Sequence, residues 1–418
     1  MLKTETAGIA VSAVSAVSAV SAEPDESDGR RAPSEPDGPP ETSPTAGRDR
    51  RGALPSLTGL RWTAALLVFL YHVSVVQYYG GRPAHVWSSA FGAGNTGVSF
   101  FFILSGFVLS WSTPRSTRAF GFWRKRFARI YPLHLATALL ALALAFTLAP
   151  GTKPDLDELV ANLLLVHSWV GNGAFYQSLN PVSWSLACEA FFYFLFPLLI
   201  IPLRRIGGRG NQIVVAACIV LEFLIPATAG YLFPARSLNF LLYYFPFARL
   251  PEFVLGMALA QVVIAGRWRG PSLAVSVGIT VTGYFLSYGV HADYRYYSCT
   301  AIGITCLIAA AARADLKGEP SAWRGSRSVR LGELSFAFYL IHILVMRTGE
   351  YVFRPHPQHG WLFGSLDVMA SFTVSLGVAY LLHTYIEMPL HKLLKPGGSL
   401  SRAERQRTRH RSRTPSCG

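Results

Sequence analysis

The sequence has few charged residues for its length. Asp, Glu, Lys and Arg make up only 15% of its 418 residues, whereas soluble globular domains carry about a quarter. Acidic residues are the scarcer kind, 23 against 38 Lys and Arg, which gives a formal net charge of +15. Because 51% of the residues are hydrophobic, this composition excludes an ordinary water-soluble domain and indicates that the lipid bilayer is the protein's solvent.

Cysteine and the common catalytic motifs are scarce as well. Four of the five cysteines lie in apolar segments, without the spacing of a metal site or a disulfide framework: Cys188, Cys218, Cys299 and Cys306. The Gly-x-Ser-x-Gly and HxxxxD motifs of soluble acyltransferases are absent. We therefore expect no metal ion and no bound cofactor.

Basic residues gather in short clusters between long apolar runs. A net charge of +15 would suit a nucleic-acid-binding protein, but such clusters are typical of the cytoplasmic loops of membrane proteins. We therefore expect no nucleic-acid partner.

Both ends of the chain lack the residues of a folded core. Residues 1–53 contain an Ala-Val-Ser repeat and then a stretch rich in Pro, Gly, Ser and charge, so we expect a disordered cytoplasmic tail. A signal peptide is the alternative, which Glu5 and the serines of the repeat disfavour. Residues 396–418 are a short basic tail that we also expect to be disordered.

Residues 54–395 form the predicted membrane domain. They contain about ten apolar segments that are long enough to cross ~30 Å of hydrocarbon as helices, which predicts an all-α polytopic membrane protein. The predicted spans cover residues 60–79, 94–112, 127–149, 184–203, 213–232, 243–264, 271–289, 297–313, 331–352 and 363–385. Residues 155–170 are too short to span comfortably and are predicted to form an amphipathic or re-entrant helix on the outer face.

The distribution of Lys and Arg predicts the orientation. If the first span leaves the cytoplasm, the connections after even-numbered spans carry most of the basic residues, and those after odd-numbered spans carry about one each. Positively charged loops stay in the cytoplasm. We therefore predict a multi-pass protein of the plasma membrane with both termini in the cytoplasm.

Ionisable residues inside apolar spans are costly, so each is a functional candidate. In the first span, Arg61 and His72 are eleven residues apart, about three helical turns, and they project from one side about 16 Å apart. The structural alternative is an arginine that reaches the interface and a histidine that hydrogen-bonds in the packed interior.

Two other spans carry polar stripes. The fourth places Ser185 and Glu189 on one face, where the carboxylate is either a structural partner or the group that orients a catalytic imidazole. The ninth places Ser335, Tyr339 and His342 at helical spacing. That stripe predicts the wall of an aqueous cavity, with helix-to-helix hydrogen bonding as the alternative.

A dense basic cluster precedes the third span: Arg124, Lys125, Arg126 and Arg129. The preference of basic residues for the cytoplasm explains part of it. Guanidinium groups also bind phosphates through paired hydrogen bonds, so the cluster suits the phosphates of an acyl-coenzyme A (acyl-CoA) used as a co-substrate.

Six segments together resemble the acyltransferase 3 family of bacterial membrane O-acyltransferases, in that family's order and spacing over about residues 55–395. They are LTGLRWTAALLVFLYHV, GVSFFFILSGFVLS, FWRKRFARIYPLH, WSLACEAFFYFLFP, LGELSFAFYLIHILV and YIEMPLHKLL. The family is typified by an Arg, ten residues and a His in the first span, here Arg61 and His72. Members acylate cell-envelope polysaccharides, peptidoglycan, lipid-linked sugars or macrolides. The extracytoplasmic hydrolase-like domain of some members is not expected after the last span here.

The resemblance implies that His72 is the essential catalytic histidine and that Glu189 belongs to the active cavity. It also implies a set of arginines that serve the acyl donor: Arg61, Arg124, Arg126 and Arg129. We therefore expect an integral-membrane O-acyltransferase that moves an acetyl or other short acyl group from acyl-CoA to a hydroxyl of a sugar or glycosylated acceptor. His72 would be the base, with Glu189 as its orienting carboxylate, and a covalent acyl-histidine is a variant route. A secondary transporter or a flippase of lipid-linked sugars is the alternative, disfavoured because no inverted repeat is visible.

Overall fold

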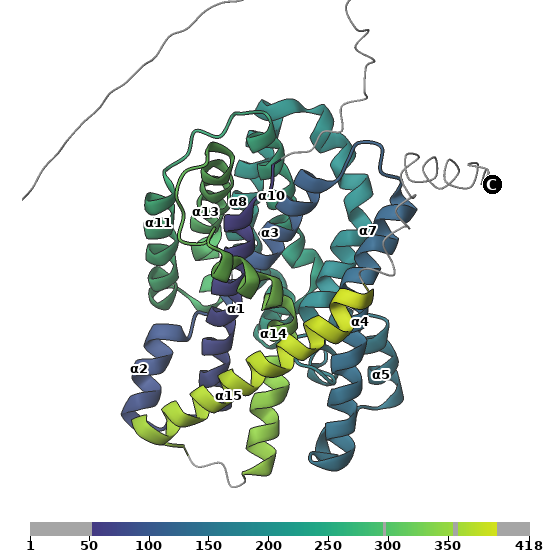
Figure 1. Cartoon of the computed structure of the whole chain (residues 1–418), viewed down its shortest axis with the longest axis vertical. Helices are drawn as coiled ribbons and strands as arrows, with labels where there is room; N and C mark the ends of the chain where they lie inside the picture. The colour runs from purple at the N-terminus through teal and green to yellow at the C-terminus, as the bar shows by residue number, and fades with distance from the viewer. Residues whose placement is uncertain (1–51, 296–297, 354–357, 391–418) are drawn as a thin grey trace, which may run out of the picture. The chain divides into compact units, whose positions relative to one another are not determined.

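The computed structural model describes residues 52–295, 298–353 and 358–390. In this part of the chain nine helical segments are long and apolar enough to cross a membrane. The chain is an all-α polytopic membrane protein, as its sequence predicts (Figure 1). The two predicted tails lie outside the described residues, apart from positions 52 and 53.

The long helices follow one another with mostly short connections. They are α1 (Pro55–Val76), α3 (Thr96–Ser112), α4 (Ala119–Thr147), α7 (Trp184–Arg205), α8 (Gly207–Leu232), α10 (Pro246–Ile264), α11 (Leu273–Leu286), α13 (Ser298–Lys317), α14 (Ser326–Val352) and α15 (Trp361–Leu382). The short helices are α2 (Gly81–Phe91), α5 (Leu156–Leu163), α6 (Gly173–Tyr176), α9 (Ala235–Asn239) and α12 (Ala292–Arg295), with π-helical turns at Phe240–Tyr244 and His383–Glu387.

Each of the ten predicted spans contains a helix. The seventh is the shortest, because α11 has only 14 residues before a 3-10 turn at Ser287–Gly289. The helix α2, between the first two spans, was not predicted, and none of its residues is buried. Hydrophobic length thus predicted where the helices lie, although only nine segments of the described residues are long enough to span, and it did not predict α2.

Residues 155–170 do not form the single outer helix that was expected. The helix α5 has eight residues, and its first turn is closed by a capping box in which Asp155 and Glu158 bind each other's backbone. It ends before Leu165, which adopts a left-handed φ of 57°. A 3-10 turn, His167–Trp169, follows. The chain breaks here because Leu165 cannot continue a right-handed helix at that φ.

Close crossings of small residues hold the bundle together. The helices α3 and α10 meet at Gly106 and Gly256, where an added Cβ would collide with the backbone of the facing helix. The helices α1 and α14 meet in the same way, with Gly332 against the backbone of Thr58. Without a hydrophobic drive between helices in lipid, such close backbone packing is a main source of their association.

The rim of the bundle is apolar and exposed, as lipid-facing surface must be. On α8 the side chains of Ile213 and Val220 are exposed, and on α15 so are those of Leu362 and Met369. Figure 1 shows α15 at a steep angle to α14, against which it packs. Its C-terminal end, the π-helical turn, contacts α4 and so reaches the site described next.

Candidate active site

A cavity of about 240 Å³ lies among α1, α3, α4, α7 and α14. Its polar lining consists of Arg61, Ser105, Arg126, Arg129, Ser185, Glu189, Tyr193 and Tyr339, and we call it the arginine cavity. The rest of its lining is largely apolar, with Phe101, Phe102 and Leu104 among it. Three guanidinium groups therefore share one hollow inside an otherwise apolar bundle.

The helix α4 supplies two of the arginines from one face. Arg126 and Arg129 are three residues apart, so their side chains project in nearly the same direction. Arg124 is exposed and does not line the arginine cavity, because two residues of helix turn it about 200° away from Arg126. The predicted donor-binding set is thus divided, with Arg61, Arg126 and Arg129 together and Arg124 apart.

The carboxylate of Glu189 faces these arginines. The charges of Arg61, Arg129 and Arg126 all act on it, and Tyr193, one helical turn further on α7, donates a hydrogen bond of 2.8 Å to its Oε2. Among the described residues Glu189 makes no hydrogen bond to His72, so the structure does not show the contact expected of an orienting carboxylate. Glu189 lies instead within the group of arginines.

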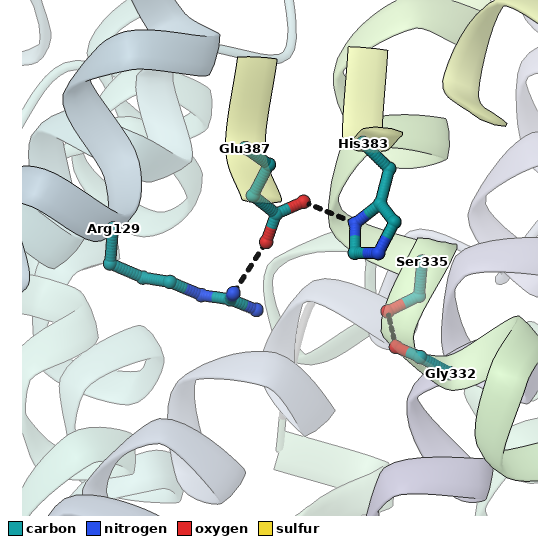
Figure 2. A network of polar contacts seen from close by, with 5 residues as sticks. All are labelled: Arg129, Gly332, Ser335, His383 and Glu387. Carbon is teal, nitrogen blue, oxygen red and sulfur yellow. Dashed lines mark hydrogen bonds and ion pairs between the residues drawn. The ribbon is translucent and has the colours of Figure 1, made fainter. Parts of the chain in front are cut away.

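A second carboxylate, which sequence analysis assigned no role, holds Arg129. Figure 2 shows Glu387 between Arg129 and His383: one oxygen forms an ion pair with the guanidinium, and the other lies 2.8 Å from His383 Nδ1. Glu387 ends the π-helical turn His383–Glu387, whose extra residue changes the direction in which side chains project. The available signal was an ionisable residue beside the last apolar span.

The polar stripe of α14 divides between three environments. Tyr339 lines the arginine cavity, and its hydroxyl lies 2.9 Å from Ser185 Oγ, so these two predicted cavity residues meet. Ser335 does not line it, because its hydroxyl bonds the carbonyl of Gly332 one turn earlier at 2.7 Å (Figure 2). His342 is fully buried and does not line it either.

His342 is instead the partner of His72. Its Nε2 lies 3.1 Å from His72 Nδ1, and the two rings stack edge to face with centroids 4.9 Å apart. The two residues are 270 positions apart in the sequence and come from α1 and α14. The role of orienting His72 thus fits His342 better than Glu189.

The hydrogen bonds of this pair fix which nitrogen carries each proton. His72 Nδ1 is 2.9 Å from the carbonyl of Val68, and His342 Nδ1 is 3.2 Å from the carbonyl of Phe338. A carbonyl only accepts, and a neutral imidazole has one N–H. Both rings therefore carry the proton on Nδ1, and His342 Nε2 accepts from His72. His72 Nε2 keeps its lone pair and can act as a base.

Comparison with known proteins gives the chemistry. The model of the acyltransferase domain family matches residues 54–384. The chain belongs to this family. Acyltransferase MdmB of Streptomyces mycarofaciens is 38% identical over 363 residues, which cover 82% of this chain and 92% of that protein.

Two further relatives are named O-acetyltransferases. Peptidoglycan O-acetyltransferase OatA of Listeria monocytogenes is 23% identical over 82% of this chain and 57% of its own length. O-acetyltransferase OatA of Staphylococcus aureus is 30% identical over 35% of this chain and 24% of its own. No solved structure is significantly similar. With its multi-pass helical fold, the chain is an integral-membrane O-acyltransferase.

Proposed function

We propose that this enzyme transfers an acetyl or other short acyl group from acyl-CoA to a hydroxyl of a sugar or of a glycosylated product, in the plasma membrane. The observation that carries the proposal is the alignment of the arginine cavity with His72 along α1. Arg61 lines the cavity, and His72 lies eleven residues further, about 16 Å along the same face.

The arginine cavity suits the charged part of the donor. Arg126 lines the cavity, and its buried Nε makes no hydrogen bond within the described residues, so no described residue uses this donor. Arg129 is held in place by Glu387. A cavity of about 240 Å³ is small beside pockets for drug-sized ligands, which start at about 300 Å³. We assign to it the phosphate and pantetheine part of coenzyme A, with the nucleotide outside.

The reaction then needs only groups already described. His72 Nε2 takes the proton of the acceptor hydroxyl, and the oxygen attacks the thioester carbonyl to form a tetrahedral oxyanion. The carbon–sulfur bond breaks, and the thiolate of coenzyme A receives the proton from His72. An ester and a free thiol result, and the histidine returns to its starting state. His342 keeps His72 in the tautomer that this step requires.

The acceptor class is supported by relatives, not by contacts. The Listeria relative is named for peptidoglycan, a sugar polymer. Membrane vesicles turned inside out and supplied with radiolabelled acetyl-CoA test the whole proposal. We expect the label in an acetylated glycan or glycoside. Intact acetyl-CoA, or free acetate formed at the same rate with and without acceptor, would contradict it.

The orientation has its own test. Single cysteines at Lys153 and Gln358 should react with an impermeant thiol reagent added outside the cell, whereas a cysteine at Arg205 should not. The reverse pattern would move the arginine cavity to the outer face and make cytoplasmic acyl-CoA an unsuitable donor.

A further inference from the structure

A second cavity, of about 360 Å³, lies further along α4 and α14, towards the C-terminal ends of both helices. We call it the loop cavity. It is lined by the C-terminal parts of α4 and α14 and by the connection between α4 and α7, with Lys153, Asp155, Glu158, Gln177, Arg347 and Tyr351 as its main polar residues. None of these residues was singled out by its sequence.

The order of residues on α14 relates the two cavities to the histidine pair. Phe336 and Tyr339 line the arginine cavity, and Leu344 and Arg347 line the loop cavity. His342, which holds His72, comes between them. From Tyr339 to Arg347 the helix rises only about 12 Å, and the charge of Arg347 acts on His72. Along the direction of α14, His72 therefore lies between the arginine cavity and the loop cavity.

The loop cavity combines charges of both signs. Lys153 and Arg347 face it together with Asp155 and Glu158. Arg347 makes no hydrogen bond or ion pair within the described residues, so its donors are available to a ligand. A strongly anionic ligand would meet the carboxylates, and a cation would meet Arg347. A neutral ligand whose groups both donate and accept hydrogen bonds suits all of them.

The shape and rigidity of the loop cavity point the same way. One wall is formed by small side chains of α4, Ala141 and Ala145, which leave room for a bulky ring. Leu179, which also lines the cavity, is held at a left-handed φ of 56°. Such strain persists only where surrounding contacts impose it.

Those contacts are buried hydrogen bonds beneath the cavity. Asn162 donates to the carbonyl of Ser178 at 2.9 Å and to its hydroxyl at 3.0 Å. The backbone carbonyl of Asn162 in turn accepts a hydrogen bond from His134 Nε2 at 3.0 Å, which links α5 to α4. Ser178 also lines the cavity. The hollow is thus built before any ligand arrives.

We propose that the loop cavity binds the acceptor, and that the acceptor presents a neutral saccharide unit there with one hydroxyl directed to His72 Nε2. This inference rests on the proposed function. It assigns donor and acceptor to two different depths along α14, with Arg347 and Glu158 as the charged residues that bind the saccharide.

The test replaces one acceptor-binding charge and a neighbouring charge that does not line the cavity. Glu158→Gln keeps the side chain that closes the capping box of α5 and removes only its charge. Asp157→Asn is the matched control, because Asp157 lies in the same helical turn but does not line the cavity. Arg347→Gln tests the other sign. The acceptors are methyl glycosides, N-acetylated chito-oligosaccharides and a macrolide glycoside, with acetyl-CoA as donor.

We expect the wild type and Asp157→Asn to acetylate a member of this panel with the same constants. Glu158→Gln and Arg347→Gln should raise the acceptor KM about tenfold, the effect of one lost charge-assisted hydrogen bond, with the donor KM unchanged. Unchanged acceptor KM in both variants would overturn the inference, as would cleavage of acetyl-CoA by the wild type without transfer to any saccharide. If the wild type does not cleave acetyl-CoA at all, the proposed function fails instead.

Discussion

Two groups of arginine and glutamate lie inside this bundle, and they differ in what surrounds them. The closed group is Arg249 and Glu252 on α10, paired at 3.0 Å and almost wholly buried. Arg249 also donates to Ser99 at 3.0 Å and lies over the rings of Phe102 and Tyr243. The open group is the set around the arginine cavity: Arg61, Arg126, Arg129 and Glu189.

The difference shows that a charge within the bundle is not enough to mark a site. In both groups arginines and carboxylates are removed from water, so residue type alone does not distinguish them. Arg249 lines neither cavity, and protein groups surround it, which is the pattern of a structural ion pair. Arg126 has a buried nitrogen that no described residue binds, next to empty volume. Position beside a cavity is the better criterion.

The largest expected effect concerns His72, the histidine that we propose as the base. His72→Ala should lower the transfer rate by about 10²- to 10⁴-fold, because the proposed base is lost, while the melting temperature stays close to that of the wild type. His134→Ala is the control, since His134 is fully buried and its side chain bonds the carbonyl of Asn162 in α5. It should lower stability far more than His72→Ala does. Rates and thermal melting of both purified variants decide the matter. Near-normal transfer by His72→Ala would show that His72 only packs.

The closed group should behave in the opposite way. Arg249→Ala leaves Glu252 buried without its cation and close enough to feel the charge of Glu222, which costs roughly 3 to 5 kcal/mol of stability. We expect little folded protein by detergent size-exclusion chromatography. The double change Arg249→Ala, Glu252→Ala should recover part of it, because the carboxylate that pairs with Arg249 is removed too and only Glu222 remains buried there. If Arg249→Ala is fully stable, water reaches this pair, and Arg249 and Glu252 are not sealed inside the bundle.

A smaller effect separates arginines within the open group. Arg126→Lys and Arg129→Lys keep the charge but would lose the paired hydrogen bonds that we propose they make to the donor's phosphates, worth roughly 1.5 to 3 kcal/mol. Each should raise the donor KM about tenfold and leave the acceptor KM unchanged. Arg124→Lys is the matched control, since Arg124 is exposed outside the cavity and should change neither constant. A donor KM equal to the wild-type value in all three variants would mean that the basic cluster only determines topology.

The smallest effect is a pH dependence of the connection that closes the loop cavity. Burial, aided by the charge of His134, lowers the pKa of His167 from 6.5 to about 3. The unfolded chain therefore binds a proton more readily, so stability is complete above pH 6.5 and falls as the pH drops towards 3. The loss between pH 7 and 5.5 is about 1 kcal/mol. Melting temperatures should fall less over this interval for His167→Gln, and equal losses would assign the acid sensitivity elsewhere.

The sequence predicted the helices better than the contacts between them. Apolar length gave the spans, and helical periodicity put Arg61 and His72 on one face. The same periodicity separates Arg124 from Arg126, which reasoning from charge density overlooked. The pairing of His72 with His342 depends on how α1 crosses α14. A single sequence contains no signal for that crossing beyond the small residues that permit it.

Reasoning from the sequence missed Glu387 and the loop cavity for other physical reasons. A π-helical turn changes the direction of Glu387, so the regular 3.6-residue period could not direct it towards Arg129. The residues of the loop cavity come from three separated segments, and several of them, such as Asp155 and Glu158, look like ordinary helix caps. Only the folded chain gathers them.

The position of His72 between the two cavities has an electrical consequence for the proposed reaction. The acyl group passes from sulfur to oxygen as the equivalent of a cation, while the hydroxyl proton passes from oxygen to sulfur through His72. One positive equivalent is thus exchanged for another at a single depth in the bundle. The proposed transfer is therefore electroneutral, and the membrane voltage neither drives nor opposes it.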